Sequence, residues 1–314
     1  MALTEINVVG REAAGGDRRL NLRQARIGVL LNTSSGSCDL EAEADLHGIL
    51  ESAGLRAEHR WCGGGADVEA ALAEARTHSL DVLVVLGGDG TIRAAAETCE
   101  PGGTLLMPLP GGTMNVLPKA LYGGRSWREA LQATLADPAI QPVHGGVAGG
   151  RRFYIAGIFG GPTKLAEARE AVREHDLAGA VEKGVAALRE SLSADSMSYR
   201  FADRAGVAEA VAVLCPLISR RLDDDERMLE AAAIRIEGTV AALRLALNAA
   251  FRDWREDPTV EHAKARLIEL SSNQPISAML DGETFTLEGN LRVEFAPSAF
   301  EALRPQGEIE AADD

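Results

Sequence analysis

The hydrophobic positions in the first half of the chain alternate between short continuous apolar runs and longer stretches with helical spacing. The apolar runs have the length of β-strands, and the run at residues 82–86 also has the β-branched residues of a strand that is covered on both faces. The predicted strands cover residues 26–32, 55–62, 82–86 and 105–109, and the predicted helices cover residues 39–53, 67–78, 92–99, 116–121 and 126–136. This alternation predicts a doubly wound α/β domain.

The pattern changes at residues 142–150, where two glycine pairs lie in a hairpin-like segment. Beyond it, short strands are predicted at residues 153–159, 208–214, 232–237, 276–280, 284–287 and 291–295, with helices at 164–192 and 239–254. We expect a mainly antiparallel β-sandwich. The predicted organisation is a loosely ordered arm over residues 1–25, an α/β domain over 26–142 with 298–310 as a candidate returning segment, and a β-rich domain over 143–297.

The strand predicted at residues 82–86 ends in a run of small and polar residues: Gly87, Gly88, Asp89, Gly90 and Thr91. Ligands of open α/β sheets bind at the carboxyl ends of the strands. Glycines let the backbone approach a bound group, and the N-terminus of the following helix favours negative charge. We interpret the segment as a phosphate-binding loop; the alternative is a strand-to-helix turn capped by Asp89 or Thr91. A divalent metal ion, or a hydrogen bond to a ribose or an acceptor hydroxyl, would explain the carboxylate beside phosphates.

A second loop repeats this arrangement after the strand predicted at residues 105–109. Its residues are Pro110, Gly111, Gly112, Thr113, Met114 and Asn115. Thr113 is a candidate helix cap that also donates to a phosphate, and the Asn115 amide can both donate and accept near a nucleotide. Alone, a capped turn and a binding loop explain this segment equally well. Its pairing with the first loop at adjacent sheet edges favours binding.

These motifs resemble the diacylglycerol kinase catalytic-domain family, which comprises bacterial lipid kinases related to sphingosine kinases and, more distantly, to NAD kinases and phosphofructokinases. The resemblance rests on residues 87–91, on residues 110–115 and on Asp281-Gly282-Glu283, and it extends over nearly the whole chain. A looser match is residues 32–36, which read Asn-Thr-Ser-Ser-Gly where the family usually has Asn-Pro-x-Ser-Gly. The resemblance implies bound ATP, contacted by the two glycine loops and by Asn32, Ser35 and Gly36.

The resemblance also implies roles for the carboxylates in phosphoryl transfer. In the family the Asp-Gly-Glu segment lies at the cleft between the domains, and its glutamate is usually assigned as the proton acceptor. An acceptor hydroxyl must be aligned with the γ-phosphorus and relieved of its proton. We therefore expect Glu283 to act as the base, Asp281 to support it, and Asp89 to hold the metal ion or the acceptor. From the residues alone, Asp281-Gly282 is a hairpin turn.

Two features depart from the family pattern. Family members commonly carry an acid or amide shortly after Gly-Gly-Asp-Gly-Thr, whereas this chain has Arg93, which is either a phosphate contact or an exposed helix residue. The family's side metal site usually lies on a loop that contains Asp-Gly. Its nearest counterpart here is the acidic run 223–226, with Asp225 as the candidate ligand and a solvated loop as the alternative.

Composition limits the partners of the protein. Its 314 residues suggest two domains, and 32 basic against 47 acidic residues give a net charge of −15, which argues against nucleic-acid binding and against a strong electrostatic hold on anionic membranes. The sequence contains no apolar run of spanning length and no signal-peptide core near its start, so we expect a cytoplasmic protein with at most transient contact at a membrane surface. An exposed edge strand of the β-rich domain is a candidate contact for a homodimer.

The cysteines and histidines suggest no further site. Cys38, Cys62, Cys99 and Cys215 have no paired spacing, so we interpret them as reduced thiols. Three histidines, His59, His144 and His175, have no partners at ligand spacing and are interpreted as structural or surface residues.

The combined prediction is an ATP- and Mg²⁺-dependent kinase that transfers the γ-phosphoryl group to a hydroxyl of a lipid such as diacylglycerol, held by the β-rich domain. NAD kinase is the enzyme alternative because it shares Gly-Gly-Asp-Gly-Thr, but it normally carries a later Asn-Glu pair, and no such dipeptide follows here. The missing acid after Thr91 motivates a second alternative, a catalytically silent ATP-binding regulatory module.

Overall fold

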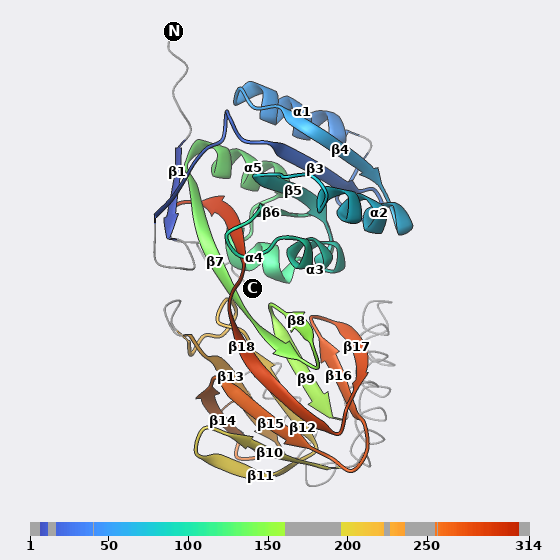
Figure 1. Ribbon diagram of the computed structural model, residues 1–314, viewed down its shortest axis with the longest axis vertical. Helices are drawn as coiled ribbons and strands as arrows, with labels where there is room; N and C mark the ends of the chain where they lie inside the picture. The colour runs from blue at the N-terminus through green and yellow to red at the C-terminus, as the bar shows by residue number, and fades with distance from the viewer. Residues whose placement is uncertain are drawn as a thin grey trace. The chain divides into compact units, whose positions relative to one another are not determined.

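The structure, a computed structural model, describes residues 7–11, 17–39, 41–160, 196–222, 227–235, 255 and 257–307. The chain forms two compact units, residues 1–144 with 297–314, and residues 145–296 (Figure 1). It passes from one unit to the other within β7 (Pro138–Ala148) and within β18 (Asn290–Pro305). The predicted helices at 164–192 and 239–254, the acidic run 223–226 with Asp225, and His175 lie outside the described residues.

A parallel sheet forms the centre of the first unit. Its strands lie in the order β4-β3-β5-β6, and the C-terminal part of β18 runs parallel to β6. Their bounds are β3 (Ile27–Asn32), β4 (Ala57–Gly63), β5 (Val82–Gly87) and β6 (Leu105–Pro110). Every residue of β5 and β6 is buried, which explains why these strands are continuous apolar runs in the sequence.

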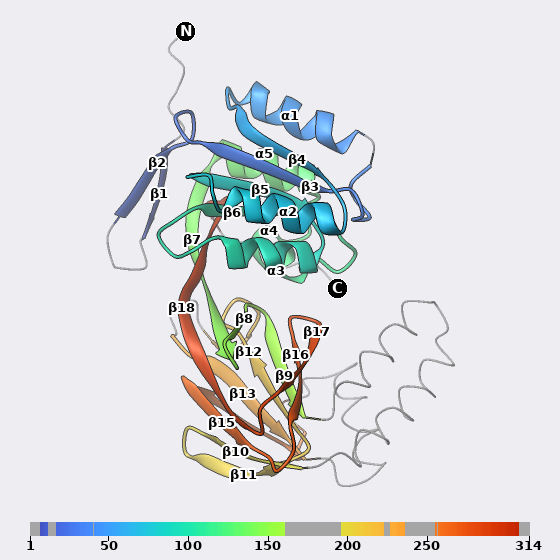
Figure 2. The same cartoon turned by 45° about the vertical axis from the view of Figure 1, so that its right-hand side comes forward.

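Helices cover both faces of this sheet. The helices are α1 (Ala42–Ser52), α2 (Ala66–Ala75), α3 (Asp89–Thr98), α4 (Val116–Tyr122) and α5 (Trp127–Ala136). α1 packs against α5, while α2 packs against α3 on the opposite face (Figures 1 and 2). Right-handed crossovers place the helices on opposite faces because the chain moves one way from β3 to β4 and the other way from β4 to β5 and β6. The predicted doubly wound domain is confirmed.

The segment before β3 contains strands. β1 (Asn7–Arg11) and β2 (Asp17–Asn21) pair antiparallel, and β1 also pairs in parallel with β7 through Val9 and Ala139. For these two segments the structure thus shows strands in place of the expected loosely ordered arm. These strands were not predicted because their sequence is polar and charged. Their backbone groups find hydrogen-bond partners through pairing with each other and with β7, which the sequence does not reveal.

The second unit consists of antiparallel strands in two sheets. The first sheet has the order β14-β13-β12-β9-β16-β17, and the second contains β11, β10, β15 and the N-terminal part of β18. A short strand, β8 (Arg151–Phe153), pairs with β7. The other bounds are β9 (Ala156–Gly160), β10 (Met197–Phe201), β11 (Arg204–Ala208), β12 (Ala210–Leu214), β13 (Leu229–Ile234), β14 (Val260–Ala265), β15 (Leu267–Ser271), β16 (Ile276–Leu280) and β17 (Glu283–Leu287).

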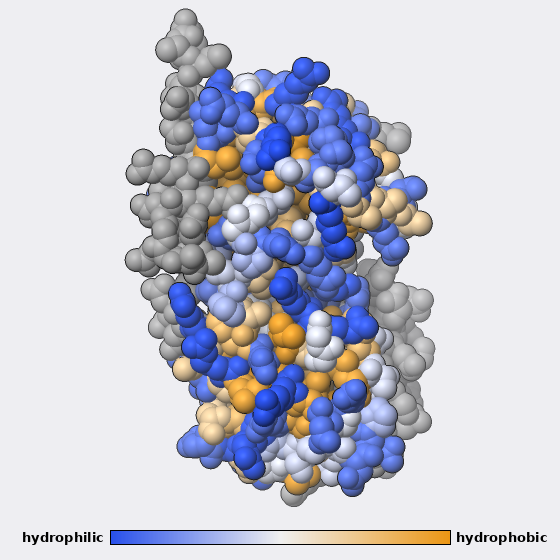
Figure 3. All heavy atoms as spheres, viewed as in Figure 1, coloured by the Kyte–Doolittle hydropathy of each residue, from blue (hydrophilic) through white to orange (hydrophobic). Residues whose placement is uncertain are grey.

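One core joins these two sheets. Alternate residues of β10, such as Tyr199 and Phe201, enter the same buried cluster as Val211 and Val213 of β12. Period-two burial of this kind is expected where two sheets pack face to face, and the predicted β-sandwich is confirmed. Large hydrophobic side chains are also exposed in this unit, among them Val207 and Leu267. Figure 3 shows apolar side chains gathered between charged ones over the β-rich unit.

Candidate functional site

Three loops leave the carboxyl ends of adjacent strands in the first unit. We name them the β3 loop (residues 32–37), the β5 loop (residues 87–91) and the β6 loop (residues 110–115). From β3 the chain continues to β4 on one side, whereas from β5 it continues to β6 on the other side. The β3 and β5 loops therefore flank the point where the strand order reverses, which is where open α/β sheets bind ligands.

The β3 loop is hydrogen-bonded to the β5 loop through two side chains. Asn32 donates from Nδ2 to Oγ1 of Thr91 at 2.8 Å, and the backbone N–H of Gly88 donates to Oγ of Ser35 at 3.0 Å. Asn32 and Ser35 were expected to contact a nucleotide. The structure shows that they also fix the relative positions of two loops, so replacement of either residue would disturb the loops even without a ligand.

The β5 and β6 loops touch backbone to backbone. The N–H of Gly111 donates to the carbonyl oxygen of Gly87 at 2.9 Å. A Cβ atom on Gly111 would lie 2.8 Å from the nitrogen of Gly87, and one on Gly112 would lie 2.7 Å from Cα of Gly88. Real Cβ atoms do not approach backbone this closely, so glycine is required here for the close approach of the two loops.

Two polar side chains hold the β6 loop in its conformation. Asp89 accepts a hydrogen bond at Oδ1 from the N–H of Val116 at 2.7 Å, and so caps α4. Asn115 has φ of 50° and bonds both ways to Gly112, accepting from its N–H and donating to its carbonyl oxygen, each at 2.7 Å. The expected capping residues were wrong. Asn115, not Thr113, occupies the N-cap position of α4, and Asp89 caps α4 instead of its own helix.

The start of α3 presents donors to open space. The first amides of an α-helix, here those of Asp89, Gly90 and Thr91, have no acceptor within the helix, and the helix dipole favours an anion beside them. A Cβ atom built on Gly90, or on Gly36 of the β3 loop, would meet no atom within 4 Å. The loops therefore combine unpaired donors with room for a group such as a phosphate.

The carboxylates near these loops fit a magnesium ion only in part. Within the residues that the structure describes, no group of three His, Cys, Asp or Glu side chains gathers at the loops, and Oδ2 of Asp89 makes no hydrogen bond. Mg²⁺ usually keeps several waters and takes one or two carboxylates together with the phosphates of its substrate. Asp89 therefore fits as a single protein ligand to an ion that phosphates also hold.

The Asp-Gly-Glu segment forms the tip of a hairpin in the second unit. Asp281 and Gly282 both have positive φ, 48° and 89°, as in a two-residue type I′ turn between β16 and β17, and Leu280 pairs with Glu283. The hairpin interpretation is confirmed. Glu283 is half-buried at the first position of β17.

The side chain of Asp281 secures this turn. Its carboxylate accepts three backbone N–H bonds, from Tyr154 at 2.7 Å, Ile155 at 2.9 Å and Ala156 at 3.0 Å. Its own N–H donates to the carbonyl oxygen of Ala156 at 2.9 Å. Tyr154 and Ile155 link β8 to β9, Ala156 begins β9, and none of the three carries a sequence signal of this role. Asp281 thus ties the hairpin tip to that link and fixes where Glu283 begins.

Arg93, which replaces the family's usual acid or amide, forms an ion pair along α3. Its Nη1 lies 2.7 Å from Oε1 of Glu97, four residues further on. The pair has ordinary i,i+4 spacing, so Arg93 is a helix residue as predicted. Its side chain is only 17% exposed, so the expectation of an exposed position was wrong.

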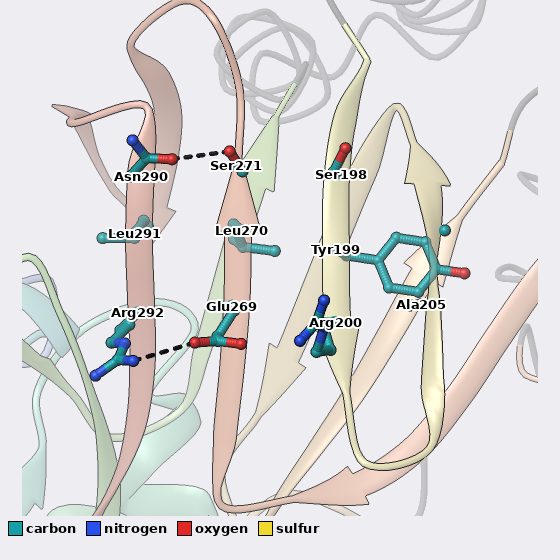
Figure 4. A pocket seen from close by; sticks show the side chains of 11 residues that line it. Ser198, Tyr199, Arg200, Ala205, Glu269, Leu270, Ser271, Asn290, Leu291 and Arg292 are labelled. Carbon is teal, nitrogen blue, oxygen red and sulfur yellow. Dashed lines mark hydrogen bonds and ion pairs between the residues drawn. The ribbon is translucent and has the colours of Figure 1, made fainter.

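A cavity of about 540 Å³ lies elsewhere in the second unit, across β10, β11, β15 and β18 (Figure 4). Its polar side chains pair with each other across the strands. Arg292 donates to Glu269 at 3.2 Å, and Ser271 donates to Asn290 at 2.8 Å. None of the predicted site residues lines its described part.

The fold and the loop cluster together define a class: a protein with a doubly wound α/β unit, a candidate ligand site of the glycine-loop type, and an antiparallel β-sandwich unit. Residues 26–146 match the sequence model of the diacylglycerol kinase catalytic domain, the family that the motifs of this segment resemble. The matched segment contains all three loops but not Asp281-Gly282-Glu283.

Solved structures share the architecture of the whole chain. A putative diacylglycerol kinase from Bacillus anthracis str. Sterne superposes with a TM-score of 0.71 at 18% sequence identity, covering 89% of this chain and 95% of its own. A diacylglycerol kinase structure from the same organism has a TM-score of 0.67 at 19% identity, covering 89% and 97%. At these identities the likeness establishes the fold.

Proposed function

We propose that this protein is an ATP-dependent kinase that transfers the γ-phosphoryl group to a hydroxyl of a lipid such as diacylglycerol. The observation that carries the proposal is the junction of the β3, β5 and β6 loops at the reversal of strand order, within the segment that matches the diacylglycerol kinase catalytic domain. ATP with Mg²⁺ would supply the phosphoryl group and neutralise its charge.

The residues of the first unit would bind and orient the phosphates. Amide N–H groups at the start of α3 donate to phosphate oxygens, and the absence of a side chain at Gly90 lets them approach. Asp89 would hold the metal ion through its carboxylate while its Oδ1 keeps the hydrogen bond from the Val116 N–H. The bonds from Asn32 to Thr91 and from Gly88 to Ser35 keep the loops in register, which limits reorganisation on binding.

The hairpin of the second unit would supply the proton acceptor. Glu283 takes the proton of the acceptor hydroxyl as the oxygen attacks phosphorus. Asp281 is a positioning residue, since its carboxylate is fully engaged with three backbone amides.

We also propose a cytoplasmic protein that meets lipid at a membrane surface. No helix within the described ranges is long and apolar enough to cross a bilayer. The net charge of −15 disfavours broad attraction to anionic lipids, so the contact is local and apolar.

A catalytically silent ATP-binding module is the second candidate. The observation in its favour is that Asp89 and Asp281 both accept hydrogen bonds from backbone amides. A structural role therefore accounts for the presence of both acids without a catalytic role. This candidate predicts ATP binding without turnover, and it predicts that Glu283→Gln has no effect on any activity.

The test is transfer of labelled γ-phosphate from ATP, with Mg²⁺, to a panel of diacylglycerol, monoacylglycerol, a sphingoid base and NAD. We expect lipid-dependent transfer that falls by roughly 10²–10⁴-fold in Glu283→Gln with ATP affinity retained. Transfer to NAD alone would establish the NAD kinase alternative, and ATP binding without transfer to any acceptor would favour the silent module.

A matched pair of glycine variants tests the phosphate site directly. Gly90→Ala adds a methyl group that meets no protein atom, so the fold is kept while the space for a phosphate is filled. Gly48→Ala makes the same change in α1, also without a contact within 4 Å. We expect about tenfold weaker ATP binding in Gly90→Ala only. Equal affinity in both variants would remove the β5 loop from nucleotide binding.

A further inference from the structure

A cluster of two histidines and a glutamate lies apart from the loops in the first unit. His59 is on β4, Glu74 is in the last turn of α2, and His78 follows that helix. One ligand atom of each residue lies within 4.8 Å of the other two, and Nε2 of His78 lies 3.4 Å from Oε1 of Glu74. The two histidines are half-buried and Glu74 is exposed, so an ion can reach the cluster from solvent.

Two local patterns bring these side chains together. His59 is on the same side of β4 as the buried Ala57, and α2 packs against this strand. Glu74 is in the last turn of α2, and the turn that follows brings His78 back beside it, with the His78 N–H donating to the carbonyl oxygen of Ala75. No ligand partner for His59 was visible at short spacing, because Glu74 and His78 lie 15 and 19 positions away on another element. The interpretation of His59 as an ordinary residue without partners is therefore corrected.

Trp61 orients the cluster. Its indole N–H donates a hydrogen bond to the Glu74 carboxylate. The Trp61 ring also stacks on His59, with ring centroids 5.7 Å apart. A donor that orients a ligating carboxylate is typical of the outer shell of metal sites. A simple ion pair between His78 and Glu74 would leave both His59 and Trp61 unexplained.

We propose that His59, Glu74 and His78 bind a divalent transition metal ion of the zinc type, which joins edge strand β4 to the end of α2. Two imidazoles and one carboxylate suit Zn²⁺ and its neighbours, whereas Mg²⁺ prefers oxygen ligands alone. Zn–N and Zn–O distances near 2.0–2.2 Å place tetrahedral ligand atoms about 3.4 Å apart, so a spread of up to 4.8 Å must contract by as much as about 1.4 Å. The two rings, stacked at 3.7 Å, turn out of their stack as they coordinate the ion, and water completes the site.

This site is distinct from the proposed Mg²⁺ position. His59 pairs with Gly28 near the amino end of β3, whereas the β3 loop begins at Asn32, at the carboxyl end of that strand. The cluster and the loops therefore lie at opposite ends of the same parallel strands. Metal at the cluster stabilises the packing of β4 and α2 and takes no part in phosphoryl transfer.

The experiment is a calorimetric titration of the full chain with ZnCl₂, together with its thermal unfolding midpoint with and without the ion. The parent protein carries Cys62→Ser, because Cys62 is exposed and a thiol there would bind zinc itself. Cys38 stays, since burial raises the pKa of its thiol to about 11 and keeps it protonated. The variants are His59→Ala, His78→Ala and Glu74→Gln. His47→Ala is the matched control, a histidine of α1 outside the cluster.

We expect one zinc ion per chain to be lost, or bound at least about tenfold more weakly, in each of the three cluster variants and to be retained in His47→Ala. The zinc-induced rise of the unfolding midpoint should disappear in the same three variants, while their midpoints with chelator stay at the parental value and Mg²⁺-dependent activity is unchanged. Zinc affinity and stoichiometry that are the same in the parent and in the His59→Ala, His78→Ala double variant would overturn the proposal. Loss on His78→Ala but not on His59→Ala would reject the three-ligand site.

Discussion

The dipeptide Asp-Gly occurs at both functional segments, and the two units use it differently. In the first unit Asp89-Gly90 opens α3, and the Asp89 carboxylate takes one amide 27 residues further along the chain. In the second unit Asp281-Gly282 forms a hairpin tip, and the Asp281 carboxylate takes three amides more than 120 residues earlier. Among the described residues, one oxygen of Asp89 makes no hydrogen bond, whereas both oxygens of Asp281 accept backbone N–H groups. Identical residues thus acquire different chemistry from the number of amides that surround them.

The largest effect that separates the two aspartates should be on stability. Asp281→Ala leaves three backbone N–H groups of residues 154–156 without their acceptor, and we expect it to lower the free energy of unfolding by about 3–4 kcal/mol. Urea unfolding followed by circular dichroism measures this. Asp281→Asn keeps one oxygen and should fall between alanine and the parent. A loss below about 1 kcal/mol in Asp281→Ala would show that the turn holds by itself.

The close contact of the β5 and β6 loops should give the next largest effect. A methyl group at residue 112 would lie 2.7 Å from Cα of Gly88, so Gly112→Ala must push the loops apart at a cost of about 2 kcal/mol. The unfolding midpoint reports that cost, with Gly48→Ala as the control glycine. If Gly112→Ala unfolds at the parental midpoint, the two loops are not held as closely as their hydrogen bond indicates.

Asp89 should show a smaller structural effect that depends on the replacement. Asp89→Ala removes the acceptor of the Val116 N–H and should cost about 1 kcal/mol. Asp89→Asn keeps an acceptor and should unfold like the parent, yet it loses the negative charge offered to a metal ion. We therefore expect Asp89→Asn to need more Mg²⁺ for the same rate. Full activity of Asp89→Asn at limiting Mg²⁺ would show that Asp89 holds no metal ion. Asp89 would then have only a structural role, like Asp281.

The smallest expected effect is a pH dependence that both units share. Burial and Arg60 lower the pKa of His47 in the first unit, and burial and Arg221 lower the pKa of His262 in the second. Because the unfolded chain binds these protons more readily, stability should fall as the pH drops through 6.5 toward the lowered values, and should be unaffected above that range. His47→Asn and His262→Asn should each flatten the change in unfolding midpoint between about pH 7.5 and about pH 5.5. If the unfolding midpoint of both variants changes with pH as much as that of the parent, the pH dependence comes from other titratable groups.

Local signals made most of the first unit predictable. β5 and β6 are buried on both faces, so they appear as unbroken apolar runs. Ser126 and Glu129 form a capping box at the start of α5, at the residue where the helix was predicted to begin. The second unit was less predictable, because strands such as β14 and β15 carry polar residues on one side. Their assignment depends on pairing with strands far away in the sequence.

The candidate site divides in the same way. The glycine loops and the Asp-Gly turn were visible in the sequence, since strand ends, helix starts and hairpins have local residue requirements. The wrong cap at Thr113 has a specific cause: the acceptor that caps α4 comes from Asp89, on a different loop.

The sequence by itself therefore determined the doubly wound fold class of the first unit, the positions of the glycine loops and the hairpin at Asp281-Gly282. Only the tertiary structure decided which amides Asp89 and Asp281 hold, how the three loops interlock, and that His59 lies beside Glu74 and His78. The physical reason is that backbone geometry and burial act over a few neighbouring residues. Hydrogen bonds and ligand clusters form between atoms that the packing of strands and helices brings close together. The residues involved are far apart in the sequence, and their spacing along the chain follows no recognisable pattern.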